Sequence, residues 1–188
     1  MKKTIIKDNK GFSLLELVVA VLILGIISAT AIASFRSIFN ARSEAAAEVA
    51  ASVLKQTRSK TMSLTDTSLT ETYAKFYVKG SDYYVDLIRV ESDTDPATPD
   101  NVQVLVTKML GNDGLTLTFR SHSNTSISNT VTSTNDVKVY FKRNTGGIAR
   151  IEAGSSDDSK LDELLITGSG GDKKVIIVRG TGRCYNAD

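Results

Sequence analysis

Residues 10–35 read KGFSLLELVVAVLILGIISATAIASF, and this stretch decides how the chain is organised. Glu16 is its only charged residue after Lys10, and the 19 residues from Leu17 to Phe35 carry no charge. A membrane-spanning helix needs about 20 predominantly apolar residues. A buried helix of a globular protein is seldom apolar on every face. The stretch therefore predicts a helix that spans a membrane over residues 12–35.

The residues that precede this stretch form a short basic leader, which we place at residues 1–11. It holds four lysines and one aspartate, so the positive-inside rule predicts that it stays in the cytoplasm. Three interpretations fit such an N-terminus: a cleaved secretory signal, a plain membrane anchor, or the leader of a precursor. Ala31-Ile32-Ala33 has the small-x-small form that signal peptidase cleaves, but the apolar run exceeds the usual 7–15 residues.

A more specific pattern lies at the junction of leader and helix. The string Lys10-Gly11-Phe12-Ser13-Leu14-Leu15-Glu16-Leu17 resembles the cleavage and methylation motif of type IV pilins and type II secretion pseudopilins. The resemblance implies that a prepilin peptidase/methyltransferase cuts between Gly11 and Phe12 and N-methylates Phe12. It also implies that Glu16 is the glutamate used in assembly with other pilin or pseudopilin subunits.

The chemistry of that glutamate suggests an assembly hypothesis. Cleavage would leave a cationic amine on Phe12 at the start of an apolar helix, and an unpaired buried charge is costly. Glu16 of a neighbouring subunit would neutralise the amine and set the stagger between subunits. Many major pilins carry a proline where this chain has Ala33, so bending would depend on Gly25 and on Ser28-Ala29-Thr30.

Beyond the apolar stretch the chain predicts an amphipathic continuation of the helix over residues 36–62. At 100° per residue its apolar and charged side chains separate onto opposite sides, with Arg42 as the one misfit. The apolar side holds Ile38, Ala46, Val49 and Val53, and the charged side holds Glu44, Glu48, Lys55 and Arg58. We expect the apolar side to pack on a sheet and the charged side to be solvated. Glu48 and Lys55 are too far apart to pair directly.

Residues 63–188 predict a β-rich globular head, because short β-prone runs alternate with turn residues. Alternation in Val102, Val104 and Val106 favours antiparallel sheets that are buried on one side. Expected exposed loops are residues 91–101 and 121–136. The expected strands are residues 73–79, 83–90, 102–110, 115–120, 137–143, 148–152, 164–166 and 174–179.

The end of the head adds a second, shorter resemblance. The turn Thr181-Gly182-Arg183 and the β-rich run before it are similar to minor pseudopilins of the general secretion pathway protein H type. This likeness implies a minor subunit. Unlike pilins that close a C-terminal loop with two cysteines, this chain has Cys184 alone.

No residue pattern in the head predicts catalysis, a cofactor or a metal site. One cysteine and one histidine exclude a disulfide framework and paired-histidine metal sites. Charges are mixed in sign and sum to +2, so no nucleic acid partner is expected. We interpret His122 beside Ser121 as a chance neighbour in a polar loop, and Asp157, Asp158 and Asp162 as solvated residues.

These observations predict an α+β chain whose long N-terminal helix spans the membrane with its first half and packs on an antiparallel, pilin-like head with its second. The function expected is structural: a minor pilin or pseudopilin, not an enzyme. It would sit in the cytoplasmic membrane with a single pass, N-terminus inside and head outside, before joining a pilus or pseudopilus. The alternative is a secreted or membrane-anchored β-domain binding protein with an ordinary signal segment.

Overall fold

The computed structural model describes residues 13–64, 70–91, 101–112, 114–153, 160–169 and 171–187, without the side chains of residues 31–37 and 39. The expected leader, Gly11 and Phe12 lie outside these ranges. The chain divides into two compact units, Met1–Ser37 and Ile38–Asp188. Within the described ranges, one long helix is followed by strands that form two antiparallel sheets, so the α+β class is confirmed.

Helix α1 covers Leu14–Met62 and ends where the expected helix ended. The segment that was expected to allow bending uses its hydroxyl groups on its own helix. Ser28 Oγ donates to the Leu24 carbonyl at 2.7 Å, and Thr30 Oγ1 donates to the Ile27 carbonyl at 2.9 Å. Such bonds give each hydroxyl a local partner without breaking the helix.

A membrane-spanning first half was expected over residues 12–35. In the part of the chain that the structure describes, no helix is both long enough and apolar enough to cross a membrane. That part of the fold prediction therefore has no support from the described residues.

The head contains two five-stranded sheets. The first has the order β3-β2-β1-β6-β7 and the second has the order β10-β9-β8-β4-β5. All described strand pairs are antiparallel. The strands are β1 (Glu71–Lys79), β2 (Asp82–Glu91), β3 (Asn101–Gly111), β4 (Leu115–Arg120), β5 (Ser128–Thr130), β6 (Val137–Phe141), β7 (Ile148–Glu152), β8 (Glu163–Gly168), β9 (Gly171–Ile177) and β10 (Cys184–Ala187).

Two of these strands were not expected. β5 lies inside residues 121–136, which we interpreted as an exposed loop, and Val131 beside it is fully buried. No strand was expected after the turn Thr181-Gly182-Arg183. The chain turns at residues 178–183 and returns as β10, which pairs antiparallel with β9. β5 has three polar residues and β10 has four residues, so neither is long enough to show the alternation that marks a strand in sequence.

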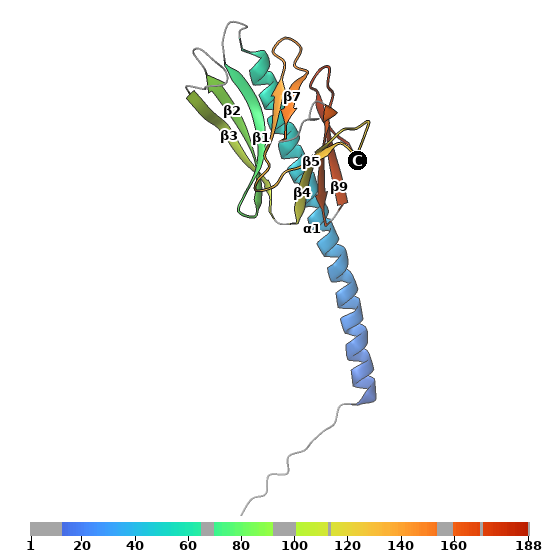
Figure 1. Ribbon diagram of the computed structural model, residues 1–188. Coiled ribbons are helices and arrows are strands. Elements are labelled where there is room, and N and C mark those ends of the chain that lie inside the picture. Colours follow the sequence, from blue (N-terminus) through green and yellow to red (C-terminus); the bar gives the residue numbers. More distant parts are fainter. Residues whose placement is uncertain are drawn as a thin grey trace, which may run out of the picture. The chain divides into compact units, whose positions relative to one another are not determined.

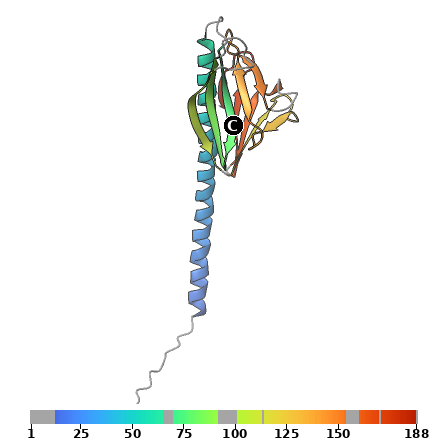
Figure 2. The same ribbon diagram turned by 60° about the vertical axis from the view of Figure 1, so that its left-hand side comes forward.

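The core lies between the two sheets and the later turns of α1 (Figures 1 and 2). Figure 2 shows both sheets on one side of these turns. Small side chains on α1 let the sheets approach closely, and Leu54 is fully buried among them. The sheets meet at Phe76 and Phe119, whose ring centroids lie 5.1 Å apart in an edge-to-face arrangement. The buried side chains of α1 are Ser43, Ala46, Ala47, Ala50, Ala51, Val53, Leu54, Thr57 and Thr61.

The predicted burial pattern fails at two places. Val102 and Val104 are 53% and 55% exposed, although their alternation predicted one buried face. The reason is position, because β3 is the edge strand of its sheet, and its register with β2 shifts between Leu87 and Ile88. Ile38, expected on the packed side of the helix, is 50% exposed because it precedes the first buried turn.

Candidate functional site

The start of α1 carries the site that the sequence predicts. Gly11 and Phe12, the expected cleavage and methylation residues, lie outside the described residues. Ser13 stands immediately before the helix, and its carbonyl accepts the first helical bond from the Leu17 N–H at 3.2 Å. Ser13 is therefore the N-cap and Glu16 is the third helical residue.

Ser13 and Glu16 have the spacing of a capping box, in which a serine and a glutamate three residues later satisfy unpaired backbone donors. A carboxylate in the first turn also interacts favourably with the helix dipole. Glu16 is exposed and makes no hydrogen bond or ion pair with any described residue. Its carboxylate can thus stabilise its own helix and still accept a cation from elsewhere.

The helix that follows is apolar on every side. Within Leu14–Ile27 each large apolar side chain is between 48% and 82% exposed. An isolated helix of this kind leaves a large apolar surface in water, so it requires other helices or an apolar medium around it. These side chains are Leu14, Leu15, Leu17, Val18, Val19, Val21, Leu22, Ile23, Leu24, Ile26 and Ile27.

Residues 6–32 match the family model described as the prokaryotic N-terminal methylation motif. The chain carries this methylation motif. It is consistent with the type IV pilins and pseudopilins that the N-terminal string resembles, and it covers residues 6–11 of the leader, Glu16 and the apolar turns up to residue 32. The match ends before the head. No curated protein and no solved structure matches the chain.

In the head, His122 forms a hydrogen bond with the buried carboxylate of Glu163, although its own side chain is 64% exposed. Glu163 is 2% exposed and accepts hydrogen bonds from Arg120 Nε at 2.6 Å and from His122 Nδ1 at 2.9 Å. The backbone N–H of His122 donates to Asp162 at 2.7 Å. Burial raises the pKa of Glu163, but the bonds from His122 and Arg120 outweigh it and hold that pKa below its usual value.

Cys184 has the properties of a structural thiol. It is 5% exposed, and burial raises its pKa to about 11. Its Sγ lies 3.4 Å from the Gly182 carbonyl oxygen, to which it can donate. A thiol with this pKa is protonated at neutral pH and is a poor nucleophile.

Acidic residues in the head were expected to be solvated rather than to bind calcium. Asp157 and Asp158 lie outside the described residues. Asp162 lies 3.5 Å from Arg179 Nε and also accepts the His122 N–H, so it is engaged within the head. Among the described residues, no three histidine, cysteine or acidic side chains come together as metal ligands.

Arg58 corrects one expectation about the helix. We expected it on a solvated face, but its Nε donates to the Gly146 carbonyl at 3.3 Å and to the Thr181 carbonyl at 2.7 Å. It therefore joins α1 to two turns of the head at once. Sequence patterning missed this role because it assigns charged residues to solvent unless a partner is close in sequence.

A close approach between Gly182 and Gly146 explains the glycine of the Thr181-Gly182-Arg183 turn. Gly182 has φ +63°, and a Cβ added there would run into the backbone carbonyl of Gly146. Only glycine satisfies both the left-handed conformation and this close approach. The turn thus lets the β9–β10 connection pack closely against the β6–β7 connection.

Proposed function

We propose that this chain is a minor pilin or pseudopilin subunit that enters a type IV pilus or a type II secretion pseudopilus. A prepilin peptidase/methyltransferase cuts between Gly11 and Phe12 and methylates Phe12. Before assembly the protein is held at the cytoplasmic membrane, with its N-terminus inside and its head outside. The observation that carries the proposal is the methylation motif over residues 6–32, which includes the turns of α1 that are apolar on every side.

Assembly would depend on two features of α1. Neighbouring helices would cover the exposed apolar side chains of residues 14–27, which no described residue of this unit covers. Glu16 would pair with the cationic amine of Phe12 on a neighbour, because that amine would otherwise be buried unpaired. The exposed position of Glu16 in the first turn supports this role.

The head supports a structural role rather than an enzymatic one. Its single histidine is exposed and hydrogen-bonded to Glu163, and its single cysteine is buried. We therefore propose that the head supplies surface for contact with other proteins.

The experiment replaces Glu16 with glutamine, which keeps the size of the side chain and removes its charge. Cells that carry a prepilin peptidase and the matching assembly system would express the full chain, and its amount in sheared filaments would be compared with its amount in the membrane. We expect Glu16→Gln to be cleaved normally but to enter filaments at least tenfold less.

The matched control is Glu44→Gln, which removes an exposed carboxylate from the same helix outside the methylation motif. It should enter filaments like the unaltered chain. Normal incorporation of Glu16→Gln would contradict the proposed pairing.

A further inference from the structure

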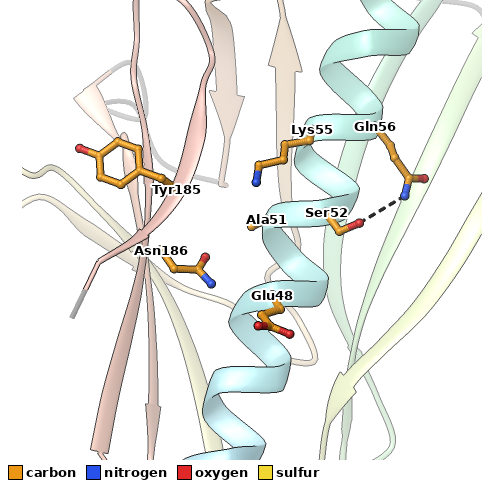
Figure 3. A pocket seen from close by; sticks show the side chains of 7 residues that line it. All are labelled: Glu48, Ala51, Ser52, Lys55, Gln56, Tyr185 and Asn186. Carbon is orange, nitrogen blue, oxygen red and sulfur yellow. Dashed lines mark hydrogen bonds between the residues drawn. The ribbon is translucent and has the colours of Figure 1, made fainter.

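A groove of about 500 Å³ lies in the head between α1 and the last strand, β10. Figure 3 shows its walls: α1 supplies Glu48, Ala51, Ser52, Lys55 and Gln56, and β10 supplies Tyr185 and Asn186. The Asn186 amide points toward the helix across the groove, whereas the Tyr185 ring points away from it. The groove is open to solvent.

β10 gives the groove a free sheet edge. It is the last strand of its sheet, and β9 is its only partner among the strands that the structure describes. An edge strand presents unpaired backbone donors and acceptors, and extended peptides bind such edges by adding a strand. A strand added beside β10 would place alternate side chains toward α1, because Cys184 and Asn186 already face that way from β10.

The helical wall carries opposite charges at its two ends. Glu48 and Lys55 are seven residues apart, which is about 10.5 Å along a helix and too far for a direct pair. Both are exposed, and neither forms a hydrogen bond or ion pair with a described residue. On the outer face of the first sheet, by contrast, charges pair within the head: Lys75 with Asp136 at 2.8 Å and Arg150 with Glu71 at 2.9 Å.

We propose that this groove receives an extended segment of a partner polypeptide, which adds as a strand to β10. The segment presents a basic side chain to Glu48 and an acidic one to Lys55. Two such side chains four residues apart on a strand face the same way and lie about 13 Å apart, within reach of both helix residues. This inference does not depend on the proposed function, because it concerns the unassembled chain.

The test measures peptide binding to the full chain in detergent micelles by fluorescence anisotropy. The probe is a labelled nine-residue peptide of alternating threonine and valine, in which the second residue is lysine and the sixth is glutamate. A control peptide carries glutamine at both positions. A third peptide keeps the charges but has N-methylated alternate amides, which block strand pairing. We expect both controls to bind at least tenfold more weakly than the probe.

Charge reversal on the protein separates the proposed contact from general attraction. Glu48→Lys or Lys55→Glu alone should weaken probe binding at least tenfold, because one end of the peptide then meets a like charge. The double variant should restore binding, since the peptide can add to β10 in the opposite direction. Glu44→Lys and Lys60→Glu, exposed on the same helix outside the groove, should change nothing.

Three results would overturn the proposal. One is the absence of probe binding up to millimolar concentration. Another is equal binding of the probe and either control peptide. The third is that neither single reversal weakens binding of the probe.

Discussion

The two units of this chain differ in sequence similarity to known proteins and in the burial of their side chains. Within Met1–Ser37, residues 6–32 match a family model, and the described side chains of this unit, residues 13–30, are exposed. The head matches no curated protein or solved structure, yet its described side chains form a dense core. The N-terminal unit therefore depends on what surrounds the chain, and the head depends on contacts within itself.

The largest expected effect is on the free energy of unfolding, when two leucines of α1, one buried and one exposed, are each replaced by alanine. Leu54 is fully buried in the head, whereas Leu22 is 60% exposed. Leu54→Ala should lower the free energy of unfolding of the head by about 2–5 kcal/mol, because it leaves a cavity. Leu22→Ala should leave that free energy within about 0.5 kcal/mol. Urea denaturation of the full chain in detergent, followed by tyrosine fluorescence, measures both free energies. Equal losses of unfolding free energy in the two variants would contradict the difference between the units.

A pair of glycines tests the turn that closes the head. Gly182 and Gly80 both have positive φ, but only Gly182 approaches another backbone group, the carbonyl of Gly146. Gly80→Ala should cost about 1 kcal/mol of unfolding free energy, which is the strain of the left-handed conformation. Gly182→Ala should cost at least about 2 kcal/mol, since the clash adds to the strain. Thermal or urea unfolding compares the two, and similar costs would show that the close approach is unimportant.

The buried carboxylate in the head predicts a smaller effect, which depends on pH. The pKa of Glu163 is lower in the folded head than its usual value of 4.5, so its contribution to stability is present above that pH. The contribution is lost as the pH falls through the folded pKa. Glu163→Gln should cost about 1–2 kcal/mol at pH 7, and its cost should shrink between pH 5 and pH 3.

The matched control for that experiment is Asp82→Asn, which changes a carboxylate in the first hairpin with no ion pair to a described residue. Its cost should be small at every pH. A cost of Glu163→Gln that stays constant from pH 7 to pH 3 would contradict the assigned role of the carboxylate.

Sequence patterning predicted the long elements well and the contacts between them poorly. The strands at residues 115–120 and 148–152 were predicted with the bounds that they have, because each is a short β-prone run between clear turns. β5 and β10 were missed because such short strands form through pairing with a neighbour, which no local pattern encodes.

In the candidate site, too, sequence patterning predicted some residues and missed others. Glu16 could be singled out because a charge within an apolar run stands out, and its place in the first helical turn follows from Ser13 as N-cap. Arg58 could not, since its partners Gly146 and Thr181 are brought to it only by folding. The groove beside β10 was unpredictable for the same reason, because its two walls lie at opposite ends of the chain.

The most direct test of the central claim is the mature N-terminus, measured by mass spectrometry on protein expressed with and without a prepilin peptidase. A terminus at N-methylated Phe12 that appears only with the peptidase is the predicted result. A terminus at Ser34, formed in either strain, would mean cleavage by signal peptidase after Ala33. That result would contradict assembly through the N-terminal helix and leave a free secreted β-domain.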